Sequence, residues 1–346
     1  MNARASTPTS TGAAPSIRAA RVSKWYGRVT ALQAVSLELE PGVWGLLGPN
    51  GSGKSTFLHL AAGQLRPSLG ELRVCGEAPF GNPAVLSKIG FCPEADALYE
   101  ELTAHQFVTA MARLTGYVKS EAQARAEAVL TRLDLHGAMH RAMGGYSRGM
   151  RQRAKLAQTL VHEPTVLLLD EPLTGTDPIS RQVILEEVRR RAEAGALVLF
   201  STHVLPEVET LTDRVLLLVR GQVVAQGKTG DIRRMMEDRP HHIRVTTARG
   251  RDLGTALAQS ASIAAVFFDD AGVTFATHDP GTAYDAIRDA AVSLDLEITS
   301  LTSPDATLDA LFHQLVEYAS RGAGTGADAG VGRHGTASPP SPGVTP

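Results

Sequence analysis

The stretch LLGPNGSGKSTFLHL, from Leu46 to Leu60, decides the fold of this chain. Within it Gly48, Gly53, Lys54 and Ser55 fit the pattern G-x-x-x-x-G-K-[ST] of a phosphate-binding loop. In such a loop backbone N–H groups surround phosphates, the lysine reaches the terminal phosphates and the hydroxyl meets Mg²⁺. The stretch therefore predicts that the chain binds a nucleoside triphosphate.

The neighbouring residues agree with this prediction. GVWGLLG, directly before the loop, is typical of a short buried strand. STFLHLAAGQL, residues 55–65, predicts a helix whose positive N-terminal end faces the phosphates. The glycines allow a tight turn and a close approach of the backbone to an anion.

Composition limits the class of protein. The chain has 346 residues, 43% hydrophobic and 20% charged, which is ordinary for about two globular domains. A net charge of −2 provides no overall basic field, so nucleic acid is not expected as a partner. The longest apolar runs fall far short of the ~18 residues that cross a bilayer. Cys75 and Cys92 form no metal-ligand pattern and are expected to be buried in a reducing compartment.

The chain changes character near Pro240. Residues 17–238 alternate β-rich runs with helical stretches, which predicts an α/β sheet covered by helices, with a helical insertion over about 95–160. Residues 240–319 predict a small α+β domain in the order strand, helix, hairpin, helix, strand, helix, with a turn at DDAG. Residues 1–16 and 320–346 are rich in small and polar residues and are expected to be disordered tails.

Polar residues follow two of the β-rich runs. VLLLDEP places Asp170 and Glu171 directly after a buried strand, where one carboxylate can bind Mg²⁺ and the other can activate a water. His203 follows ALVLF and is a candidate to polarise a phosphate. Taken alone, such an acidic pair is a solvated turn or a helix cap, and a lone histidine is structural. Next to a phosphate loop the catalytic interpretation is favoured.

From Ile17 to about Met236 the chain resembles the ATP-binding cassette (ABC) ATPases. The resemblance rests on motifs in the family's order, which are GPNGSGKST, YSRGM at Tyr146 to Met150, LLLDEP, TGTDP and STH. They correspond to the family's phosphate loop, signature sequence, second nucleotide motif, D-loop and switch histidine. Tyr26 matches the aromatic residue that stacks on adenine, and the neighbouring Trp25 shares that role or packs.

The resemblance implies a P-loop NTPase core, with ATP and Mg²⁺ as cofactors, in head-to-tail dimers of nucleotide-binding domains. The nucleotide-binding positions would be Tyr26, Gly48, Pro49, Asn50, Gly51, Ser52, Gly53, Lys54, Ser55, Thr56, Glu94, Ser147, Gly149 and Asp177. Ser147 and Gly149 would reach the γ-phosphate bound by the partner subunit, and Asp177 would couple the two sites.

The same resemblance assigns the chemistry. Lys54 would hold the β- and γ-phosphates, Ser55 and Asp170 would bind Mg²⁺, Glu171 would be the general base and His203 would contact the γ-phosphate.

Two positions depart from the family pattern. Glu94 stands where the family has glutamine, and a glutamate there can still bind Mg²⁺ or hold a water. Arg148 stands where the signature has glycine, and its guanidinium either points inward near phosphates or outward into solvent. A basic residue in the signature resembles bacterial exporters whose ATPase and membrane parts are separate chains.

The expected function is an ATPase subunit that powers a membrane transporter, an exporter, from the cytoplasmic face of the cell membrane. Its expected partners are integral membrane subunits and a second nucleotide-binding subunit. The alternatives are a soluble ABC ATPase and a nucleotide-dependent regulator with poor turnover.

Overall fold

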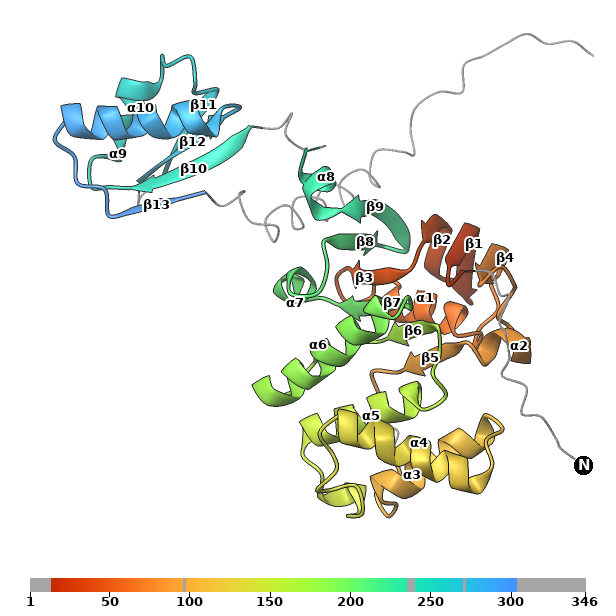
Figure 1. Ribbon diagram of the computed structural model, residues 1–346. Coiled ribbons are helices and arrows are strands. Elements are labelled where there is room, and N and C mark those ends of the chain that lie inside the picture. The colour runs from red at the N-terminus through yellow and green to blue at the C-terminus, as the bar shows by residue number, and fades with distance from the viewer. Residues whose placement is uncertain (1–13, 96–97, 235–239, 270–271, 304–346) are drawn as a thin grey trace, which may run out of the picture.

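The computed structural model describes residues 14–95, 98–234, 240–269 and 272–303. The strands in these ranges form a six-stranded, a three-stranded and a four-stranded sheet (Figure 1). The first two sheets lie before Pro240 in the sequence and the third follows it. Helices accompany the sheets in both parts, which confirms the predicted α/β core. The predicted tails fall outside the described residues, apart from residues 14–16.

The six-stranded sheet has the order β5-β6-β7-β3-β8-β9. Its strands are β3 (Gly42–Leu47), β5 (Ile89–Cys92), β6 (Val166–Leu169), β7 (Leu197–Thr202), β8 (Arg214–Val219) and β9 (Gln222–Lys228). Every pair from β5 to β8 is parallel, and only β9 runs antiparallel to its neighbour. The carboxyl ends of the parallel strands therefore meet at one edge, where α/β sheets bind ligands.

Apolar side chains cover both faces of this sheet. In β7, Leu197 and Leu199 enter one hydrophobic core, whereas Val198 and Phe200 enter the other, and all four are fully buried. Strands that are buried on both faces have continuous apolar sequences. The runs VLLL and ALVLF therefore predict strands in the core. Each fully buried side chain of this size stabilises the fold by roughly 1.5–3 kcal/mol.

An antiparallel sheet shares the first of these cores. It has the order β2-β1-β4 and consists of β1 (Ile17–Tyr26), β2 (Val29–Leu39) and β4 (Leu69–Val74). This sheet is not predicted from the sequence. Its register shifts between Ala19 and Val22 break the alternation of apolar and polar residues by which a half-buried strand is recognised.

Helix α1 (Lys54–Ala61) starts directly after the phosphate loop, as predicted, but it ends four residues earlier than Leu65. The reason lies at Gly63, which adopts a left-handed conformation with φ 70°. A Cβ at this position would approach the carbonyl oxygen of Pro79 and a methyl group of Leu86 too closely. The chain therefore turns away at Gly63 to enter β4.

The predicted helical insertion consists of α3 (Ala104–Leu114), α4 (Lys119–Arg132) and α5 (Arg148–Leu160), which share the second core with the sheet. A capping box fixes the start of α3, because the Thr103 side chain accepts from the Gln106 amide and the Gln106 side chain accepts from the Thr103 amide. α3 and α4 are separate helices because Gly116, with φ 104°, turns the chain between them.

Four further helices lie before Pro240, namely α2 (Pro83–Leu86), α6 (Pro178–Glu193), α7 (Leu205–Glu209) and α8 (Thr229–Arg234), together with a 3₁₀ turn at Met143–Gly145. In the described residues no helix combines the length and the apolar character that crossing a bilayer requires.

The residues after Pro240 form the four-stranded sheet β11-β12-β10-β13 with two helices. The elements are β10 (His241–Thr246), α9 (Gly250–Leu257), β11 (Ala265–Asp269), β12 (Gly272–Thr277), α10 (Pro280–Ser293) and β13 (Ser300–Thr302). This is the predicted order as far as β13. Residues 270–271 of the predicted turn and the predicted last helix lie outside the described residues.

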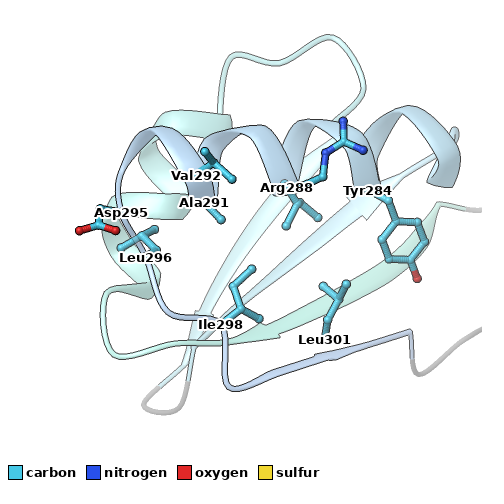
Figure 2. A pocket seen from close by; sticks show the side chains of 9 residues that line it. Tyr284, Arg288, Ala291, Val292, Asp295, Leu296, Ile298 and Leu301 are labelled. Carbon is cyan, nitrogen blue, oxygen red and sulfur yellow. The ribbon is translucent and has the colours of Figure 1, made fainter.

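A pocket of about 500 Å³ lies between α10 and the edge strand β13 of this second part (Figure 2). Its lining includes Tyr284, Val292 and Leu301, whose exposed fractions are 37%, 77% and 47%. The described surface of this part therefore includes a largely apolar groove beside an edge strand.

Candidate functional site

The candidate site residues follow the carboxyl ends of the parallel strands. The phosphate loop, Gly48 to Gly53, follows β3, Glu94 follows β5, Asp170 and Glu171 follow β6, and His203 follows β7. Since these strands are neighbours in the sheet, residues that are far apart in sequence come together at one edge (Figure 1).

The phosphate loop uses two glycines in the left-handed region. Gly51 and Gly53 have φ 77° and 105°, and a Cβ at Gly53 would approach the carbonyl oxygen of Ala31 and a methyl group of Leu32. Pro49 is half-buried and accepts a 3.1 Å hydrogen bond from the Ser52 amide, so the loop closes on itself before α1 begins.

Several polar groups of the loop fit a phosphate. The Ser52 hydroxyl is buried and has no hydrogen-bond partner in the described protein, which is a costly arrangement unless a ligand satisfies it. The exposed Asn50 and Gly51 lie at the open tip of the loop, and half-buried Ser55 and Thr56 lie in the first turn of α1. That turn contains no acidic residue that would oppose an anion at the helix N-terminus.

The Lys54 side chain folds back and bonds to the backbone of the phosphate loop. Its side chain is buried, and Nζ donates hydrogen bonds of 2.7 and 3.3 Å to the carbonyl oxygens of Gly48 and Pro49. Burial lowers the pKa of Lys54, while the carboxylates of Glu171, Asp170 and Glu94 act in the opposite direction. A buried cation that is only partly compensated is suited to receive an anionic ligand.

Asp170 and Glu171 are held by Ser201, which is not among the predicted site residues. The hydroxyl of Ser201, the residue before Thr202 in β7, donates a 2.5 Å hydrogen bond to Asp170 Oδ1 and accepts one of 2.9 Å from the Glu171 amide. Ser201 is fully buried. A polar residue near the end of an otherwise apolar strand indicates a role for Ser201. The sequence does not show its partners, because they follow another strand.

Removing this hydroxyl should weaken the core of the site. We expect Ser201→Ala to lower the free energy of unfolding by about 1.5–3 kcal/mol, because a buried carboxylate and a buried amide would lose their partner. Urea unfolding followed by tryptophan fluorescence measures this, since the chain's two tryptophans, Trp25 and Trp44, both lie before Pro240. The exposed Ser87→Ala is the control and should shift stability by less than about 0.5 kcal/mol. Equal stabilities of the two variants would contradict the assignment.

Both carboxylate oxygens of Glu171 are engaged. The Thr174 hydroxyl donates a 2.9 Å hydrogen bond to Oε2, and His203 Nδ1 lies 3.0 Å from Oε1. The backbone of Glu171 is left-handed, with φ 48°, a conformation that costs energy for a residue with a Cβ and that is often found at functional sites. The Glu171 side chain is 8% exposed and is thus fixed in one orientation, whereas His203 is half exposed beside it.

A magnesium ion would find few protein ligands here. No cluster of three or more His, Cys, Asp or Glu side chains suited to a metal occurs in the described ranges. Asp170 is buried with one oxygen bonded to Ser201, and the Ser55 hydroxyl is the second candidate. Such a sparse donor set fits Mg²⁺, which usually keeps several waters and is bound together with substrate phosphates.

Ser147, Gly149 and Asp177 form a separate cluster where α5 meets α6. Ser147 caps α5 by accepting from the Met150 amide, and Asp177 caps α6 by accepting from the amide and hydroxyl of Ser180. These bonds from Ser180 lower the pKa of Asp177. A Cβ at Gly149 would overlap Asp177 and Ser180, so the two helix starts touch only because this residue is glycine.

Tyr26 lies at the end of β1, away from the buried core. Its side chain is 47% exposed and that of Trp25 is 43% exposed. Nζ of Lys24 lies 5.4 Å from the centre of the Tyr26 ring. Part of the Tyr26 ring is therefore accessible for stacking, and so is part of the Trp25 ring.

The chain is similar in sequence to known ATP-binding proteins of ABC transporters. The model of the family described as ABC transporter matches residues 32–174. The uncharacterised ABC transporter ATP-binding protein YxlF of Bacillus subtilis is 37% identical over 62% of this chain and 71% of its own length. The daunorubicin/doxorubicin resistance ATP-binding protein DrrA of Streptomyces peucetius is 36% identical over 66% of this chain and 70% of its own length.

A solved structure, described as the ATP-binding subunit of an ABC transporter, superimposes with a TM-score of 0.59 at 28% identity. The match covers 64% of this chain and 92% of that one.

Proposed function

This chain belongs to the family of ABC transporter ATP-binding proteins, and on that premise we propose that it binds and hydrolyses ATP to power a membrane transporter. The observation that carries the proposal is the fixed orientation of Glu171 at the sheet edge that also bears the phosphate loop. A buried carboxylate beside a phosphate-binding lysine is the arrangement that hydrolysis of a terminal phosphate requires.

In the proposed reaction a water oxygen attacks the γ-phosphorus of ATP. Glu171 accepts a proton from this water, and the bond from the γ-phosphorus to the β–γ bridging oxygen breaks, which leaves ADP and phosphate. Lys54 and the loop amides neutralise charge on the β- and γ-phosphates. His203, which contacts Glu171 here, polarises the γ-phosphate when nucleotide is present.

Ser55 and Asp170 would hold Mg²⁺, with Glu94 as a further ligand through water. Bound there, the ion would neutralise phosphate charge. The protein's part is to orient Asp170, which the hydrogen bond from Ser201 does.

We propose a dimer of cassettes in which Ser147 and Gly149 face the nucleotide bound by the partner subunit, while Asp177 links the two sites. The support is that Ser147 is exposed at the start of α5. We further propose an exporter working at the cytoplasmic face of the cell membrane with integral membrane subunits. The support is that two similar proteins, DrrA and the linearmycin resistance ATP-binding protein LnrL of Bacillus subtilis, are named for drug resistance.

Capture of the tagged chain from detergent-solubilised native membranes tests this proposal. We expect a polytopic membrane protein to be recovered in a fixed ratio, with ATP hydrolysis that vanadate inhibits. Recovery of the chain alone or with ribosomes would instead favour a soluble ABC ATPase, and binding of ATP without turnover would favour a regulator.

Tyr26 is assigned to the adenine ring. We expect Tyr26→Ala to weaken ATP binding roughly tenfold, because stacking of an aromatic residue on a base contributes about 1–3 kcal/mol. Titration with a fluorescent ATP analogue measures the dissociation constant. Trp25→Ala is the matched control, and a larger loss in that variant would transfer the stacking role to Trp25.

A further inference from the structure

The two positions that depart from the family pattern meet in one place. A pocket of about 430 Å³ is lined by Glu94, Ala95, Arg148, Gln152, Glu171 and Thr174. Glu94 and Arg148 are 54 positions apart in the chain, yet they border the same space as the proposed general base.

Arg148 is directed toward a loop of its own subunit. It is the first residue of α5, and its guanidinium lies against Gly175, so that a Cβ on Gly175 would overlap its Cζ and Nε atoms. Gly175 has φ 67°, which leaves its backbone open to this contact. Arg148 is an exposed residue, so its guanidinium packs on Gly175 while the side chain keeps contact with solvent.

The loop beneath Arg148 positions the general base. Thr174, which donates to Glu171 Oε2, directly precedes Gly175. The Thr176 hydroxyl and amide both bond the Leu173 carbonyl, and Asp177 then caps α6. A planar guanidinium packed on this turn restricts the conformations of Thr174 and thereby those of Glu171.

The same pocket is lined by two carboxylates and one guanidinium. Glu94 adds a carboxylate to the pocket that Glu171 also lines, and two negative charges that border one space repel each other. Arg148 lines the same pocket and contributes a positively charged guanidinium to it.

We propose that Arg148 is a positioning residue within its own subunit, which holds the turn at Gly175 and compensates the charge of Glu94 beside Glu171. This inference rests on the proposed function. In this proposal Arg148 acts on Glu171 of its own chain. It does not contact the phosphate bound by the partner subunit.

The test is a double-mutant cycle on the full chain in its detergent-solubilised membrane assembly. We expect Arg148→Gly to lower kcat about tenfold, equivalent to ~1.4 kcal/mol of barrier, with little change in the dissociation constant for ATP. Adding Glu94→Gln should restore most of this loss, and Arg148→Lys should restore part of it because it returns charge without the planar contact. Independent effects of the two substitutions, or a tenfold weaker ATP affinity in Arg148→Gly, would overturn the proposal.

A readout that needs no turnover separates this inference from the proposed function. Hydrogen exchange of the Thr174 and Thr176 amides should be faster in Arg148→Gly, because the turn loses the guanidinium packed on it. Unchanged exchange would overturn the positioning role even if the wild type hydrolyses ATP. A wild type without ATPase activity would refute the proposed function, while faster exchange would still establish the contact.

Discussion

Glu171→Gln is expected to lower the rate of ATP hydrolysis on the order of 10²–10⁴-fold, the contribution usual for a positioned general base. Glutamine keeps the shape of the side chain, so its carbonyl oxygen can still accept from Thr174 while its amide faces His203. ATP affinity should therefore remain near that of wild type, and the variant should accumulate as a closed dimer with ATP bound. Phosphate release and size-exclusion chromatography with ATP measure the two effects.

The control for this substitution is Glu186→Gln. Glu186 is an exposed residue of α6 and accepts a 2.9 Å hydrogen bond from the Gln182 side chain on the same helix. It should retain the wild-type rate. A Glu171→Gln variant that turns over ATP as fast as Glu186→Gln, with the membrane subunit present, would remove Glu171 from the role of general base.

Lys54→Met is expected to weaken ATP binding at least about 100-fold, or ~2.7 kcal/mol, because charge-assisted bonds to the terminal phosphates are lost. The pKa of Lys54 is lowered by burial, so at neutral pH the charged amine stabilises the nucleotide-free fold less than it would if exposed. This penalty is fully present at pH values below the lowered pKa of the folded state and is lost as the pH rises from there to the ordinary lysine pKa. The nucleotide-free variant should therefore unfold near the wild-type temperature.

Calorimetric titration and thermal unfolding, each with and without ATP, give both quantities. Lys119→Met, at an exposed position in the first turn of α4, controls for the loss of one positive charge. An unchanged titration with ATP would overturn the assignment of Lys54, and a variant already unfolded without nucleotide would show that its role is structural.

The sequence predicted the parts of the site that depend on local pattern. The phosphate loop has fixed spacing, and continuous apolar runs identify β3, β6 and β7, so the meeting of Lys54, Asp170 and His203 at one edge follows from parallel topology. The roles of Ser201 and Thr174 could not be predicted, because a hydroxyl gives no sign of which distant carboxylate it will bond. The packing of Arg148 on Gly175 is likewise a tertiary contact between α5 and the loop before α6.

The absent side chain at Gly149 has a mechanical consequence. Because the first turn of α5 rests directly on the capping group of α6, neither helix start can slide without pushing the other. Core packing of this kind resists gradual deformation. A tilt of the helices α3 to α5 would therefore shift the turn that precedes α6. This turn lies within a few residues of Glu171, the carboxylate that would activate water.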